Sequence, residues 1–140
     1  MLNFEQLICE EIQGYQGPHQ ELVACTPFMY RLLTRVLDDP ELPGRLRPLV
    51  LVAIAYFMLP VDTISEDLTG PRGYLDDLYF AAMVADTIQR DLGSEDLLVR
   101  NWEGKGAFFP LIENILRQEK ELIGDQKDVM LWYTGFEHLI

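Results

Sequence analysis

The segment between residues 60 and 77 concentrates the side chains that could do chemistry. It holds five carboxylates within sixteen positions, at Asp62, Glu66, Asp67, Asp76 and Asp77. Carboxylate oxygens are hard ligands, which suit Mg²⁺, Mn²⁺ or Ca²⁺ rather than zinc. A loop and the start of a helix could bring three of them together, and Asp62, Asp76 and Asp77 are the candidate ligands. One hypothesis is therefore a divalent-metal site, which could serve a metal-dependent hydrolase.

The same carboxylates also have a structural interpretation that needs no cofactor. Asp76 and Asp77 fall in the first turn of a predicted helix, whose unpaired N–H groups and dipole stabilise negative charge. Asp62 follows Pro60 and can fold its side chain onto backbone N–H groups ahead of it. A helical projection from Leu75 places Asp77 among apolar residues and points Asp76 about 100° away. We therefore expect a partly buried Asp77, a solvent-exposed Asp76, and a polar clasp that holds two buried helices together.

No other set of residues indicates catalysis. His19 and His138 lie near opposite ends of the chain, and neither Cys9 nor Cys25 has a neighbouring histidine in the sequence. The chain has no Gly-x-Ser-x-Gly motif, and the glycines around Lys105 lack the other residues of a phosphate-binding loop. The sequence therefore favours a protein that is not an enzyme.

Apolar residues recur at helical spacing along most of the chain, and no segment alternates as a strand does. The run Leu49–Leu59 is apolar nearly all round, which predicts the central helix of the fold. As a helix this run would span about 16 Å, too short to cross a bilayer. A second long helix is predicted from about Tyr74 to Leu92, with Gly93 as its stop. We predict an all-α protein, with residues 1–140 forming one compact bundle of about five to seven helices.

Composition narrows the classes of partner. The 140 residues are 49% hydrophobic and carry a net charge of −12. Such a surface repels phosphate backbones and anionic lipid, so we expect neither nucleic acid nor a membrane as a ligand. Two cysteines, and a start with neither basic residues nor a long apolar stretch, favour a cytoplasmic protein. The acidity leaves open an inhibitor that blocks a basic partner.

Aromatic residues gather in the last forty positions. Core packing is the expected role of such a set, and the alternative is an exposed patch that recruits a partner or a second copy of the chain. With no catalytic set in view, the sequence predicts a module that acts through protein–protein contacts, as an adaptor or a homodimer. The set comprises Trp102, Phe108, Phe109, Trp132, Tyr133 and Phe136.

The region from about residue 49 to residue 85 resembles the YkvA-like family (DUF1232). The shared order is an apolar helix, Pro-x-Asp-x-Ile, an acidic loop, and Gly-Tyr-x-Asp-Asp at the start of the next helix. Ser65 stands where the family usually has proline, and the loop is about one residue longer. The resemblance implies an α-helical bacterial module, sometimes found near membrane segments, with no established activity. The matching positions are Pro60, Asp62, Ile64, Glu66, Gly73, Tyr74, Asp76 and Asp77.

Overall fold

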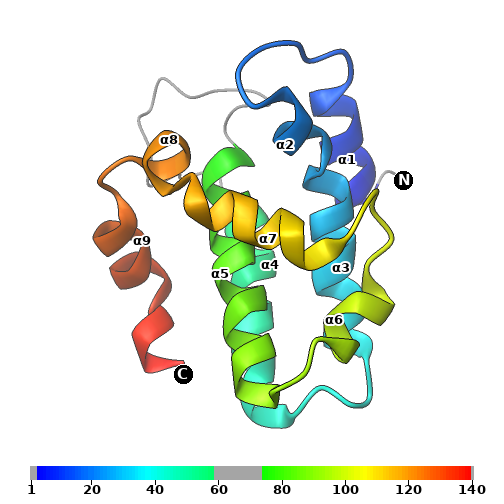
Figure 1. The fold of residues 1–140 in the computed structure, drawn as a ribbon, viewed down its shortest axis with the longest axis vertical. Coiled ribbons are helices and arrows are strands. Elements are labelled where there is room, and N and C mark those ends of the chain that lie inside the picture. The colour runs from blue at the N-terminus through cyan, green and yellow to red at the C-terminus, as the bar shows by residue number, and fades with distance from the viewer. Residues whose placement is uncertain (1–2, 59–73, 140) are drawn as a thin grey trace.

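The computed structural model describes residues 3–58 and 74–139, and these residues form helices and turns without a strand (Figure 1). Six of the nine described α-helices have eight or more residues, which agrees with the predicted all-α class. The helices are α1 (Phe4–Ile12), α2 (Gln20–Ala24), α3 (Thr26–Asp38), α4 (Arg47–Met58), α5 (Leu75–Leu92), α6 (Asp96–Asn101), α7 (Phe108–Arg117), α8 (Glu119–Ile123) and α9 (Lys127–Thr134). The described residues also form the 3₁₀ turns η1 (Gly44–Leu46) and η3 (Phe136–His138).

The central element is α5, not α4 as the sequence predicts. Eleven of the eighteen residues of α5 are buried, because α2, α3, α4, α7 and α8 all pack against it. In Figure 1, α7 crosses in front of α5, and α9 stands at the edge of the molecule opposite α3. One face of α4 is open to solvent, where Leu51 is 47% and Met58 is 53% exposed. The apolar run identifies a helix correctly, but apolarity alone does not determine which helix the others surround.

Glycine ends α5 where the sequence predicts a stop. Gly93 has a φ of 66°, and its N–H donates to the carbonyl of Gln89. This left-handed conformation is easily adopted only by glycine, so the helix ends there and the chain turns toward α6. No described helix is both long enough and apolar enough to cross a membrane.

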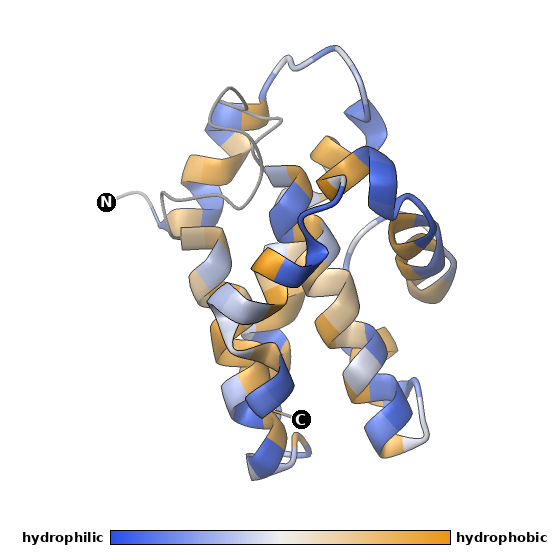
Figure 2. Ribbon diagram, turned by 90° about the vertical axis from the view of Figure 1, so that its left-hand side faces the viewer, coloured by the Kyte–Doolittle hydropathy of each residue, from blue (hydrophilic) through white to orange (hydrophobic). Residues whose placement is uncertain are grey.

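The C-terminal aromatic residues divide between the core and the surface. Phe108 and Phe136 are buried, so the expected core packing is confirmed for them, while Trp102 and Phe109 are half-buried. Trp132, by contrast, is 82% exposed, and Tyr133 is 41% exposed. Figure 2 shows the general pattern: hydrophobic residues concentrate where helices face each other, and hydrophilic residues lie at helix ends and in outer connections.

The carboxylate of Asp39 lies in the segment that connects α3 to α4, and it holds this segment against α6. Asp39 accepts hydrogen bonds from the Arg100 guanidinium, at 3.0 and 2.7 Å, and from the Asn101 amide at 2.9 Å. It also accepts the backbone N–H of Glu41 at 2.9 Å. These donors, led by Arg100, hold the pKa of Asp39 well below its ordinary value.

This arrangement predicts a specific loss of stability in acid. The folded-state pKa of Asp39 is depressed, so its contribution is complete above the unfolded pKa of about 4 and disappears as pH falls through the lower folded value. We expect Asp39→Asn to cost about 2 kcal/mol of unfolding free energy at pH 7 and progressively less below pH ~4. Urea titrations across this range measure the difference. The control is Asp38→Asn, because Asp38 is the exposed neighbour of Asp39 and its replacement should have little effect on the unfolding free energy at any pH.

Candidate functional site

The structure describes the part of the predicted motif that lies at the start of α5. Tyr74, Asp76 and Asp77 are among the described residues. The other motif positions, Pro60, Asp62, Ile64, Glu66 and Gly73, lie outside them. The geometry of the site is therefore that of the first turns of α5 and the helices that cover them.

Asp76 and Asp77 are both buried, with 1% and 4% of their surface exposed. This confirms the expectation for Asp77 and shows that the expectation of a solvent-exposed Asp76 is wrong. The projection treats the face opposite the apolar arc as wet, whereas the first turns of α5 are covered on both sides. On the side of Asp76 the cover comes from α4, where the Tyr56 hydroxyl donates to Asp76 Oδ2 at 3.0 Å.

Tyr56 positions its hydroxyl from inside the core. It is 3% exposed, and its ring stacks on that of Phe80 with 5.2 Å between centroids. A buried carboxylate costs several kcal/mol unless hydrogen bonds or charges compensate it. Both Tyr56 and the N–H groups of the first turn of α5 can contribute to that compensation. The bond between Tyr56 and Asp76 thus ties the end of α4 to the start of α5, as the clasp interpretation requires.

Two further tyrosines connect this part of α5 to other helices. Tyr74 donates to a Glu11 carboxylate oxygen of α1, and Tyr79 donates to Glu119 Oε1 of α8 at 2.5 Å. Burial and the neighbouring Glu119 raise the pKa of Tyr79, while the hydrogen bond from Tyr79 lowers the pKa of Glu119. Lys127 of α9 completes this contact at 3.3 Å from Glu119.

These tyrosine–carboxylate bonds escape sequence analysis because their partners are distant in the chain. The separations are 20, 63 and 40 positions. Only Tyr56 gives a signal, since it carries the one polar side chain between residues 48 and 58. A single hydroxyl in such an apolar helix indicates a buried partner.

The metal-site hypothesis stays a prediction. In the described ranges, 3–58 and 74–139, no three His, Cys, Asp or Glu side chains are grouped so that they could hold a metal ion. Asp76 and Asp77 are two of the three predicted ligands, and the third, Asp62, is not among the described residues.

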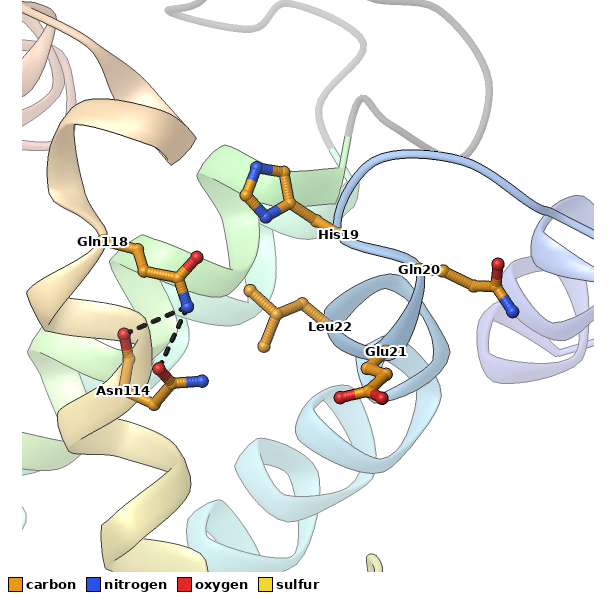
Figure 3. A pocket seen from close by; sticks show the side chains of 6 residues that line it. All are labelled: His19, Gln20, Glu21, Leu22, Asn114 and Gln118. Atoms are coloured by element: carbon orange, nitrogen blue, oxygen red, sulfur yellow. Dashed lines mark hydrogen bonds between the residues drawn. The ribbon is translucent and has the colours of Figure 1, made fainter.

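An open cavity of about 440 Å³ lies between α2 and α7 (Figure 3). In Figure 3 the side chains of His19 and Glu21 point in different directions, so they do not form an acid–base pair. Gln118 donates to the Asn114 side chain at 3.0 Å across one wall. None of the predicted motif residues lines this cavity. The lining residues are His19, Gln20, Glu21, Leu22, Asn114 and Gln118.

An apolar surface lies on the solvent-facing side of α4. This side has no polar residue after Arg47, and its residues recur at helical spacing. The opposite side of the helix is buried, and there the Tyr56 ring meets Tyr133 of α9 edge-on, with 6.4 Å between centroids. We call the exposed surface the α4 face. It consists of Pro48, Leu51, Ala55 and Met58.

The fold and the site together define a class: an all-helical bundle whose central helix begins with two buried aspartates. Residues 47–83 match the model of a family described as "Protein of unknown function (DUF1232)", which confirms the resemblance to DUF1232. The matched segment runs from the start of α4 into α5, and so contains Tyr56, Asp76 and Asp77.

The similarity to another protein extends beyond the family segment, over nearly the whole chain. The chain is 26% identical over 136 residues to "Uncharacterized protein ORF9" of Methanothermobacter thermautotrophicus, an alignment that covers 96% of this chain and 92% of the relative. No solved structure gives a significant match. Neither the description of the family nor the name of the relative states a function.

Proposed function

We propose that this chain acts by binding another protein through the α4 face, and not by catalysis. The observation that carries the proposal is the apolar outer side of α4. A helix surface that meets only water normally carries polar residues, yet Leu51, Ala55 and Met58 are all exposed on this side. Contiguous exposed apolar surface of this kind is typical of interaction sites.

Charge favours a protein over other ligands for this face. The chain carries a net charge of −12, which opposes association with anionic lipid and with nucleic acid. No charged side chain interrupts α4 after Arg47. The ligand class that fits such an uncharged face on an acidic chain is therefore the apolar patch of a protein.

Site-specific photo-crosslinking tests the proposal. Benzoylphenylalanine at position 51 is expected to give covalent protein adducts on irradiation in the native host, because Leu51 lies at the middle of the face. The same group at position 99 is the matched control, since Val99 is an aliphatic residue of α6 with 50% exposure. Met58→Asp should suppress the adducts from position 51. If position 51 gives no protein adduct, the proposal is wrong.

A bound divalent cation is the second candidate, with a structural or a hydrolytic role. Two adjacent carboxylates, Asp76 and Asp77, are buried at the start of α5, and burial of this kind requires compensation. With Asp62 they are the predicted ligands for Mg²⁺, Mn²⁺ or Ca²⁺. The variants of Asp76 discussed below separate this candidate from the clasp.

The hypothesis of an acidic inhibitor that blocks a basic partner has less support than the two candidates above. Several described carboxylates are paired with arginines of the same chain on separate elements, including Glu5 with Arg31 and Asp91 with Arg45. An inhibitor that mimics nucleic acid would need its acidic groups available along one face.

A further inference from the structure

We infer that a hollow beside α9 binds a guanidinium group, the head group of arginine. The inference goes beyond the α4 face and does not depend on it. The hollow has a volume of about 280 Å³ and is formed by α9 and η3, at the edge of the molecule in Figure 1. This size is at the lower end for small-ligand sites, so the hollow suits one head group. Its lining residues are Asp128, Leu131, Trp132, Gly135, Glu137 and His138.

Trp132 supplies a flat aromatic surface for the cation. It is 82% exposed, although tryptophan is highly buried on average in folded proteins. Ring pairs among the described residues include Trp102 and Tyr133 but not Trp132, so both faces of this indole are available. A guanidinium group stacks on aromatic faces, and the cation–π attraction is strongest for tryptophan.

Two carboxylates beside the indole can pair with the positive charge. Asp128 precedes Trp132 by four positions in α9, which places both side chains on the same side of the helix. Glu137 lines the hollow from η3. Both carboxylates are exposed, and neither forms an ion pair within the part of the chain that the structure describes, where Lys127 pairs with Glu119 instead.

The lining favours a guanidinium group over other cations. Asp128, Glu137 and His138 are potential metal ligands, yet no three such side chains among the described residues are grouped closely enough to hold a metal ion. A guanidinium is wider than a metal ion and carries five N–H donors, so it can reach separate carboxylates while it stacks on the ring. A quaternary ammonium has no N–H donor and is typically bound by a cage of aromatic residues, whereas the described lining offers one tryptophan.

The chain contains the same combination elsewhere, with an arginine in place. The Arg31 guanidinium carbon lies 5.7 Å from the centroid of the Phe28 ring. Arg31 Nε donates to Glu5 Oε1 at 3.0 Å, so an aromatic ring and a carboxylate hold one arginine together. Trp132 with its two carboxylates presents the same kinds of group, and no described Lys or Arg lines that hollow.

Two sources could supply the guanidinium: free arginine, or an arginine side chain of a protein. Free arginine also carries a carboxylate, which the net charge of −12 disfavours. We therefore expect a side chain without a neighbouring free carboxylate to bind more tightly than the free amino acid.

NMR titration of the full chain with N-acetylarginine amide tests the inference. The chain has two tryptophans and so two indole N–H signals, of which the one lost in Trp132→Phe belongs to Trp132. This signal should shift with a dissociation constant in the millimolar range, because stacking and exposed ion pairs are each weak. The signal of Trp102 is the internal control, since its indole N–H donates to the Gly106 carbonyl at 3.2 Å and Trp102 does not line the hollow.

Matched ligands and variants complete the experiment. N-acetylcitrulline amide has nearly the same shape without the charge and should give no shift. Asp128→Asn and Glu137→Gln should each raise the dissociation constant about threefold, and together about tenfold. Asp125→Asn changes the net charge equally, at an exposed carboxylate outside the hollow, and should leave the constant unchanged.

Three results would each overturn the inference: equal shifts with the arginine and citrulline probes, an unchanged constant in the double variant, or tighter binding of tetramethylammonium than of the arginine probe. Free arginine, used in a parallel titration, identifies the source. Weaker binding than that of the amide supports a protein side chain, and equal or tighter binding supports the free amino acid as the guanidinium ligand. The crosslinking at position 51 is independent of every one of these results.

Discussion

Replacing Asp76 by alanine is expected to lower the free energy of unfolding by about 3 kcal/mol. The change removes the acceptor of the Tyr56 hydroxyl, which stays buried in the core beside Phe80. A buried donor that loses its acceptor forfeits the hydrogen bond and retains its desolvation cost. Urea denaturation followed by circular dichroism measures the loss. Tyr56→Phe should cost less, about 1 kcal/mol, because the ring and its packing are retained.

Asp128 provides a matched control for this experiment. It is the second residue of α9, as Asp76 is the second residue of α5, but it is exposed. Both aspartates lie in a first turn and interact with a helix dipole, so Asp128→Ala measures the dipole contribution alone, which should be below about 1 kcal/mol. Equal losses in the two variants would mean that the burial of Asp76 contributes nothing, and the clasp interpretation would be wrong.

The same site separates the clasp from the metal hypothesis. If the carboxylates serve only the architecture, the melting temperature should not respond to MgCl₂, MnCl₂ or CaCl₂ beyond the general effect of salt. A resident cation predicts a rise that depends on its concentration and disappears in Asp76→Asn and Asp77→Asn but not in Asp128→Asn. That result would establish the divalent-cation site in place of the clasp.

Phe80→Ala is expected to have the largest effect, a loss of about 4 kcal/mol. Phe80 is completely buried, stacks on Tyr56, and meets Phe136 of η3 edge-on with 5.9 Å between centroids. The deletion leaves a cavity between α4, α5 and the C-terminal turn, which the rigid neighbours can fill only in part. Thermal and urea unfolding measure the loss, and limited proteolysis should show earlier cleavage near α9, since Phe136 loses a packing partner.

The control for Phe80→Ala is the removal of an equally large aromatic side chain from the surface. Trp132→Ala deletes a residue that is 82% exposed, so the stability of the monomer should change by less than about 0.5 kcal/mol. A small effect of Phe80→Ala, comparable with that of Trp132→Ala, would contradict the packing described around α5.

Much of the fold could be predicted from local patterns. Helical periodicity identifies the all-α class and the two long helices, α4 and α5, and glycine chemistry locates the end of α5 at Gly93. The arrangement of the helices could not be predicted this way. Exposed Leu51 and buried Leu49 are the same residue type in the same apolar run, and the packing of α3 and α5 against α4 determines which of them meets water.

The sequence predicted which residues belong to the candidate site, but not which of their side chains are buried. The sequence identifies Tyr74, Asp76 and Asp77 as motif positions, and it correctly expects a buried Asp77. It misses the burial of Asp76 because the cover comes from Tyr56, on a different helix, and a projection of one helix contains no information about its neighbours. The sequence also gives no reason to expect different environments for Trp132 and Phe136, although Trp132 lies at the surface and Phe136 in the core.

The hydrogen bond between Tyr79 and Glu119 makes the attachment of α8 to α5 sensitive to alkali. Loss of the phenol proton would place a phenolate against a carboxylate, in a setting where burial already raises the pKa of Tyr79. The stabilisation from this contact is complete at neutral pH and disappears as the pH rises beyond about 10. Acid therefore weakens the contacts of Asp39 and of Glu119, whose pKa values are both lowered, whereas alkali acts on Tyr79, where α8 and its successor α9 are attached to α5.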